Sequence, residues 1–129
     1  MPHLKIFLTA GALFGATGVL FGAFGAHALE SQLEVSSLHA WETAVSYQLG
    51  HAMALLLVGI WGLQVEVNAH LPTPLVLAGW SFLSGIVLFS GSLYLLALNG
   101  PSLLGPVTPI GGAALIFGWL ALVGAALRR

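Results

Sequence analysis

Charged residues are scarce in this chain of 129 residues. Lysine, arginine, aspartate and glutamate together make up 5% of it, whereas hydrophobic residues make up 58%. A soluble domain carries about 25% charged residues, which cover the surface that faces water. With a mean hydropathy of +1.00, this chain has too few polar groups for such a surface. The sequence therefore predicts a protein that lies in a lipid bilayer, where this length allows about four spans of roughly 20 residues.

Cysteine is absent altogether, and basic residues are few. Without cysteine the chain has no disulfide, no thiolate ligand for zinc and no thiol nucleophile. The formal net charge of -1 provides no basic surface for nucleic acid. The partner we expect is the lipid bilayer, with no nucleic acid.

Glycine is abundant, and five glycines mark the first apolar segment. Gly11, Gly15, Gly18, Gly22 and Gly25 are separated by four, three, four and three residues, so they fall on one stripe of a helix. Glycine lowers the stability of a soluble helix by about 1 kcal/mol per residue, but in a bilayer it lets a second helix approach closely. We therefore predict that this stripe packs against a neighbouring helix.

Four apolar segments are expected to span the membrane as helices, which makes residues 1–129 a single transmembrane domain. The segments lie at about 4–29, 41–63, 75–98 and 110–127. The connection at 99–109 holds three of the prolines and is expected to be non-helical.

Small residues recur in the fourth segment. Gly111, Ala114, Gly118, Ala121 and Ala125 repeat the alternation of three and four residues. A period of 3.5 residues predicts shallow left-handed crossings between helices. The predicted fold is thus all-α: an integral membrane four-helix bundle, left-handed and packed through glycine and other small residues.

The first segment offers a second face as well. Thr9, Ala16, Ala23 and His27 lie roughly opposite the glycine stripe. A helix with small residues on two sides can touch two neighbours, so we predict that this segment lies inside the bundle.

The few basic residues predict an orientation. Lys5 precedes the first span, and Arg128 and Arg129 follow the fourth. By the positive-inside rule both termini are expected in the cytoplasm, which an even number of spans allows.

Polar side chains gather in the outer half of the predicted bundle. His51 lies about ten residues into the second span, which at about 1.5 Å per residue puts it roughly 15 Å deep. By depth, six residues from three spans are expected to line one outward-opening pocket. They are His27, Glu42, Tyr47, Gln48, His51 and Ser92. Two interpretations stay open: a site for a small polar molecule, a quinone head group, a proton or a metal, and a set of hydrogen bonds that fix helix register.

The spacing of these residues does not favour the common catalytic sites. His27 and His51, as haem ligands, would sit at depths about two turns apart. His39 and Glu42 form a His-x-x-Glu pair at the membrane surface, and no Glu-x-x-His pair occurs for a di-metal site. Ser92 has no elbow motif and no third orienting acid. We therefore expect no catalytic residue, no metal and no cofactor.

Four blocks of residues, in order, resemble one family. They are Gly-Ala-Phe-Gly-Ala-His at 22–27, Thr-Ala with Tyr-Gln and His-Ala at 43–52, Phe-Ser-Gly-Ser-Leu-Tyr at 89–94, and Gly-Pro-Val-Thr-Pro-Ile-Gly-Gly at 105–112, followed by Gly-Trp at 118–119. This pattern is similar to the YgdD-like small inner-membrane proteins, a family built on domain of unknown function 423. The resemblance covers nearly the whole chain. It implies a four-span integral protein of the bacterial inner membrane, and it implies no known reaction, substrate or cofactor.

Two functions follow as hypotheses. The first is a non-enzymatic helix bundle that self-associates or serves as an accessory subunit of a larger membrane complex. The alternative is a small-molecule-binding or transport protein that uses Tyr47, Gln48, His51 and His27. Direct hydrogen bonds to Gln48 and His51 would favour the first, and a cavity that touches them would favour the second.

Overall fold

The computed structural model describes residues 2–66 and 70–128, which form helices joined by short connections, with no strand among them. The elements run in the order α1 (Pro2–Phe24), the π-helix η1 (Gly25–Leu29), α2 (Val35–Glu66), α3 (Thr73–Ala97), the 3-10 helix η2 (Ser102–Leu104) and α4 (Val107–Leu127). A helix pairs its own backbone polar groups, which a lipid environment requires. Four helical segments of the described chain are long and apolar enough to cross a membrane, so the predicted four-span all-α fold is confirmed.

All four long helices begin earlier than the sequence predicts, and the difference is largest for α2 and α4. α2 begins at Val35 instead of residue 41, because no proline or glycine interrupts the residues between them. α4 begins at Val107 although Pro109 follows, since a proline in the first turn of a helix has no amide hydrogen bond to lose. The connection at 99–109 is therefore partly helical, and η2 occupies its middle.

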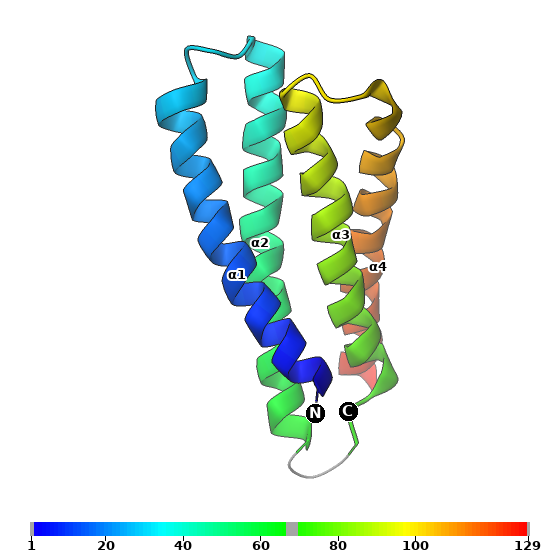
Figure 1. Ribbon diagram of the computed structural model, residues 1–129. Helices are drawn as coiled ribbons and strands as arrows, with labels where there is room; N and C mark the ends of the chain where they lie inside the picture. The colour runs from blue at the N-terminus through cyan, green and yellow to red at the C-terminus, as the bar shows by residue number, and fades with distance from the viewer. Residues whose placement is uncertain (1, 67–69, 129) are drawn as a thin grey trace.

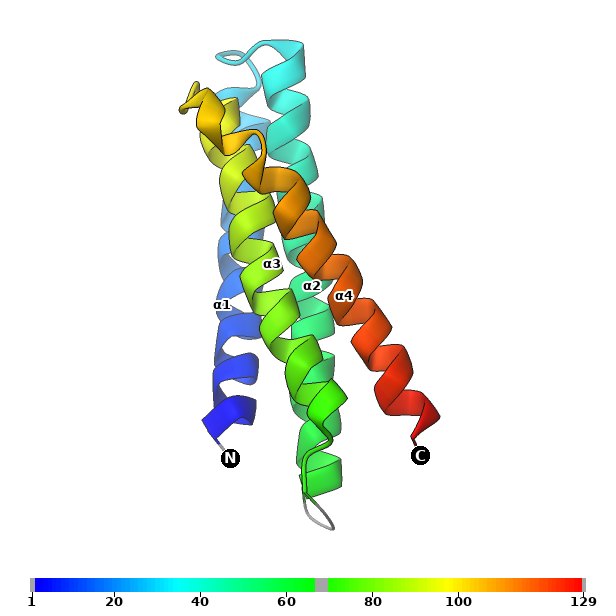
Figure 2. The ribbon, with the colours of Figure 1, turned by 90° about the vertical axis from the view of Figure 1, so that its right-hand side faces the viewer.

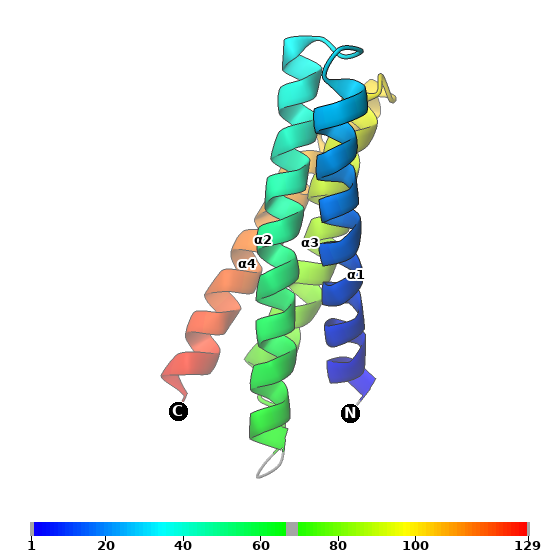
Figure 3. The same ribbon diagram turned by 90° about the vertical axis from the view of Figure 1, so that its left-hand side faces the viewer.

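The four long helices stand side by side in chain order (Figure 1). α1 packs along α2 and touches α3, α2 packs along α3, and α4 packs chiefly along α3. Figure 2 and Figure 3 show α1 and α4 at opposite edges, with the C-terminal half of α4 diverging from α2. The start of α1 and the end of α4 lie at the same end of the bundle (Figure 1).

The prediction that the first span lies inside the bundle is wrong. Thr9, Ala16, Ala23 and His27, the side expected to meet a second neighbour, are all exposed. The reason is the position of α4, which packs on α3 at the other edge of the bundle and leaves α1 covered by α2 and, in smaller part, by α3.

Four of the five glycines in the α1 stripe receive a side chain from α2. A Cβ atom added to the glycine would meet Leu56 at Gly11, Leu49 at Gly18, Val45 at Gly22 and Trp41 at Gly25. Gly15 differs, because nothing lies within 4 Å of its Cβ position. Along the glycine stripe, the contact between α1 and α2 is therefore made by α2 side chains that pack against these glycines.

The closest backbone approach joins α3 and α4. A Cβ atom added to Gly111 would meet backbone atoms of Leu88 and Phe89, whereas at Gly118 it would meet the Phe82 ring 2.6 Å away. These two glycines of α4 therefore set how closely the helix lies on α3.

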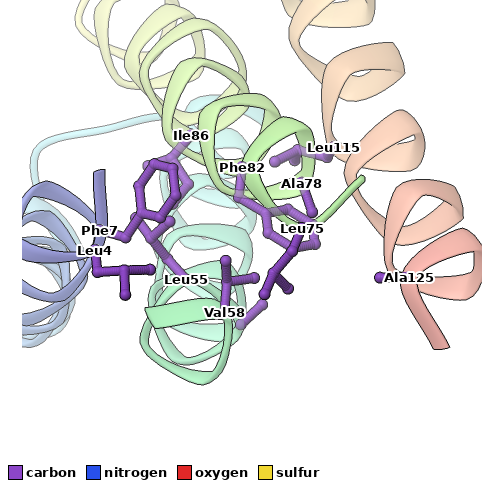
Figure 4. Packing of buried hydrophobic residues seen from close by; sticks show 11 residues of the cluster. Leu4, Phe7, Leu55, Val58, Leu75, Ala78, Phe82, Ile86, Leu115 and Ala125 are labelled. Carbon is purple, nitrogen blue, oxygen red and sulfur yellow. The ribbon is translucent and has the colours of Figure 1, made fainter. Parts of the chain in front are cut away.

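Large apolar side chains from all four helices fill the interior (Figure 4). Phe7 of α1 and Phe82 of α3 are both fully buried. Phe7 lies on Gly79 of α3, where its ring occupies the space of the missing side chain. This cluster fixes α1 and α4 to the central pair of helices, and the polar contacts described next lie beside it.

Candidate functional site

Gln48 of α2 joins three helices. Its side chain is 3% exposed. The amide nitrogen Nε2 donates to the Phe14 carbonyl at 2.9 Å and to the Thr17 hydroxyl at 2.7 Å, both on α1. The amide oxygen Oε1 accepts from the Tyr94 hydroxyl of α3 at 2.6 Å. Both polar atoms of the Gln48 amide are thus used in contacts between helices.

His51 joins α2 to α4. The indole Nε1 of Trp119 donates to His51 Nε2 at 2.9 Å. An indole N–H can only donate, so Nε2 carries no hydrogen and the ring is neutral. Nδ1 therefore carries the hydrogen and donates to the Tyr47 carbonyl at 2.8 Å. Both ring nitrogens of His51 have partners within the protein.

Two further polar contacts hold the N-terminal part of α2. Trp41 Nε1 donates to the Phe21 carbonyl of α1 at 2.9 Å, and the Trp41 ring lies 4.7 Å from the Tyr94 ring between centroids. The Ser90 hydroxyl of α3 donates to the Ala44 carbonyl at 2.8 Å. Trp41 therefore ties α2 to α1, and Ser90 ties α3 to α2.

Ser92 links α3 to α4. Its hydroxyl is 2.5 Å from the Thr108 hydroxyl and 3.0 Å from the Phe89 carbonyl. Because the Ser92 hydroxyl donates to Phe89, it accepts from Thr108. Ser92 is 3% exposed and faces the first turn of α4, away from the Gln48 contacts.

The structure does not bring the six candidate residues together in one pocket. Gln48 and His51, only three residues apart on α2, contact different helices. Tyr47 is 46% exposed. His27 on η1 and Glu42 on α2 are also exposed.

Four hydrogen-bond partners were not among the residues predicted for the site. They are Thr17, Tyr94, Thr108 and Trp119. Each of the four is a polar or amphipathic residue within or beside an apolar span. They could have been predicted as partners by comparing their depths in the membrane with those of Gln48, His51 and Ser92. Within residues 2–66 and 70–128, no group of three or more histidine and carboxylate side chains is placed to hold a metal ion.

Two hollows lie along the contact between α1 and α2. The first, which we call the seam cavity, has a volume of about 340 Å³ and is lined by residues that include Gly22, Ala26, Glu30, Trp41, Glu42 and Ser46. The second, the seam groove, has a volume of about 470 Å³ and is lined by residues that include Ala12, Gly15, Val19, Leu49, Met53 and Leu56. Neither hollow is lined by Tyr47, Gln48 or His51.

Comparison with known families decides the classification. The sequence profile of a family described as "Protein of unknown function (DUF423)" matches residues 21–112, which is more than half of the chain. The chain belongs to the DUF423 family. The part matched by the DUF423 profile holds Gln48, Tyr94 and His51, while Trp119 lies beyond it.

Relatives extend the match to almost the entire length of this DUF423 protein. A UPF0382 membrane protein of Staphylococcus epidermidis is 44% identical over 125 residues, covering 97% of this chain and 98% of the relative. The UPF0382 membrane protein YwdK of Bacillus subtilis is 40% identical over 125 residues, with the same shares. No solved structure matches the chain. The names of the relatives and the four apolar helices agree that this DUF423 protein is a small integral membrane protein.

A structural role for His51 leads to a first prediction. His51→Phe removes both hydrogen bonds of the ring and is expected to destabilise the bundle by about 1–2 kcal/mol, the range for such bonds within membranes. Thermal unfolding in dodecyl maltoside measures the change. Trp119→Phe removes only the bond to Nε2 and should cost less. The double variant should cost little more than His51→Phe, because the Trp119 contact is already lost in that variant. His27→Phe, at an exposed position on η1, is the control and should leave the unfolding temperature unchanged. An unchanged unfolding temperature for His51→Phe would contradict the structural role.

Proposed function

We propose that this DUF423 protein is a non-enzymatic membrane protein that works by associating with other membrane helices, first of all with those of a second copy. The observation that carries this proposal is that the internal polar side chains form hydrogen bonds within the protein. An enzyme needs an acid, a base or a nucleophile that is free to meet a substrate. Here Gln48, His51 and Ser92 are engaged in contacts between helices. In the described part of the chain, no buried side-chain nitrogen or oxygen lacks a hydrogen-bond partner.

A regular apolar row on α4 supports association. The row, which we call the α4 seam, lies on the side of the helix that its neighbour α3 does not cover. It consists of Ala113, Ile116, Leu120, Val123 and Leu127, all exposed. Their spacing of three, four, three and four residues is the pattern that lets two helices interlock side chains in a left-handed crossing. The α4 seam therefore suits contact with another helix of the same kind.

The α4 seam gives a second prediction. In native mass spectrometry from dodecyl maltoside, the wild-type protein is expected to show a dimer. Ile116→Ala/Leu120→Ala should raise the dissociation constant of this dimer about tenfold, because two interlocking side chains are shortened. The matched control is Ile110→Ala/Phe117→Ala, which shortens two exposed side chains on α4 outside the seam. A monomeric wild-type protein, or equal losses in the two variants, would contradict self-association through the α4 seam.

We further propose that the protein lies in the bacterial plasma membrane with both termini in the cytoplasm. The charge distribution supports this orientation. Lys5 and Arg128 lie at one end of the bundle, and Arg129 lies outside the described residues. The opposite end carries Glu30 and Glu34 and no lysine or arginine. Excess positive charge marks the cytoplasmic side of a membrane protein.

A further inference from the structure

The seam cavity and the seam groove lie one after the other along the same side of the α1–α2 contact. On α1 their lining residues follow one another at intervals of three or four, which keeps them on one side of the helix. These are Ala12, Gly15, Val19, Gly22 and Ala26. On α2 the same intervals connect Glu42, Ser46, Leu49, Met53 and Leu56. The two hollows, which together we call the α1–α2 depression, are therefore aligned along the α1–α2 contact.

The two ends of this depression differ in chemistry. The seam cavity holds two carboxylates, Glu30 and Glu42, at the end of the bundle opposite Lys5 and Arg128. No lysine or arginine occurs between residues 6 and 127, so the chain has no side chain of either kind to neutralise these carboxylates. The uncompensated negative charge lies beside Trp41, a residue type that favours the membrane surface. This end suits a positively charged group.

The seam groove is apolar. Its floor and walls are glycine, alanine and aliphatic side chains together with Met53. From Ser46 of the seam cavity to Leu56 of the seam groove the depression follows ten residues of α2. At about 1.5 Å per residue this is about 15 Å, the length of an extended alkyl chain of roughly 12 carbon atoms. Gly15 adds a separate observation. No atom of a neighbouring helix lies within 4 Å of its Cβ position, so packing within the bundle leaves this part of the groove floor open.

We propose that the α1–α2 depression binds an amphiphile with a primary amine head group and a single extended alkyl chain. The ammonium group lies between Glu30 and Glu42 in the seam cavity, and the alkyl chain runs over Gly15 along the seam groove. The proposal follows from charge complementarity at one end and an apolar groove of matching length at the other. It is independent of self-association, because the α4 seam lies on a helix at the opposite edge of the bundle.

The test compares three amphiphiles that share a 12-carbon chain: dodecylamine, dodecanol and dodecanoate. Each is titrated against the full-length protein in dodecyl maltoside at pH 7, and bound molecules are counted by native mass spectrometry. Dodecylamine is expected to bind about tenfold more tightly than dodecanol, since it forms two partly exposed ion pairs, and dodecanoate is expected to bind least. Equal binding of dodecylamine and dodecanol would overturn the proposal.

Two variants separate the head-group site from the alkyl site. Glu30→Gln/Glu42→Gln should remove the preference for dodecylamine over dodecanol. Its control is Glu34→Gln, which removes an exposed carboxylate at the same end that does not line the cavity. Gly15→Leu should fill the groove floor and abolish binding of all three amphiphiles. Its control is Gly91→Leu on α3, another glycine with nothing within 4 Å of its Cβ position.

Circular dichroism shows whether each variant is folded before titration. Both Gly15→Leu and Gly91→Leu place the new side chain in open space, so both variants are expected to fold. A folded Gly15→Leu protein that binds dodecylamine like the wild type would overturn the proposal. The proposal would also be overturned if the preference for dodecylamine survived Glu30→Gln/Glu42→Gln. Equal loss of this preference in Glu34→Gln would overturn it too, because the preference would then depend on overall surface charge.

Discussion

Gly111→Ala is expected to destabilise the bundle by about 1–3 kcal/mol, the cost of forcing one extra methyl group into a filled space. The new Cβ atom would meet the backbone of Leu88 and Phe89. A backbone cannot rotate away as a side chain can, so α3 and α4 must separate along their contact. Thermal unfolding in dodecyl maltoside, followed by circular dichroism, measures the loss.

The neighbouring residue supplies the control. At Gly112 an added Cβ atom would lie 3.6 Å from the Phe89 side chain, which is ordinary van der Waals contact. Gly112→Ala also improves helix propensity by up to about 1 kcal/mol, so the unfolding temperature should stay the same or rise. If both alanine variants unfold at the wild-type temperature, the close contact of α3 with α4 is not what sets stability.

Gln48→Leu is expected to destabilise the protein by about 2–3 kcal/mol. Leucine has a similar volume, but it removes the bonds that Gln48 makes to Phe14, Thr17 and Tyr94. The Tyr94 hydroxyl is then left without its acceptor in a largely apolar interior, and the unmet hydrogen bond adds to the loss. The same unfolding measurement applies, at equal detergent concentration.

A double-mutant cycle tests whether Gln48 and Tyr94 act through each other. Tyr94→Phe in the wild-type background should lower stability, because the Oε1 atom of Gln48 loses its donor. In the Gln48→Leu background the same substitution should cost nothing or stabilise the protein, since the hydroxyl no longer has a partner to lose. An equal cost in both backgrounds would show that the two side chains do not interact.

The spans and the small-residue contacts could be predicted because they depend on local sequence. An apolar stretch of about 20 residues predicts a span wherever its neighbours lie. The spacing of Gly111 and Gly118 likewise places both on one face of α4, and that face is the one that meets α3. The glycine stripe of α1 is a partial case, since four of its glycines contact α2 and Gly15 lies open.

The candidate site was harder to predict because it depends on which helices are neighbours. Depth alone places Gln48 level with Ser92 and His51 somewhat deeper, close enough to predict one pocket, but depth does not say what each side chain faces. Side chains three residues apart on a helix differ in direction by about 60°. Gln48 therefore points to α1 and α3, whereas His51 points to α4. The prediction that α1 lies inside the bundle was wrong for the same reason. Its second face of small residues predicts a neighbouring helix, but that face is exposed.

The order of the helices has a consequence for biosynthesis. Each long helix packs chiefly on the one that precedes or follows it in the chain, so the bundle can assemble one hairpin at a time as the chain leaves the ribosome. The contacts of Gln48 with α1 form once the first hairpin is inserted, but its Oε1 atom waits for Tyr94 of α3. The first hairpin therefore enters the membrane with an unmet hydrogen-bond acceptor. Packing of the third helix supplies the Tyr94 hydroxyl and removes that deficit, so the two-helix stage is less stable than the complete bundle.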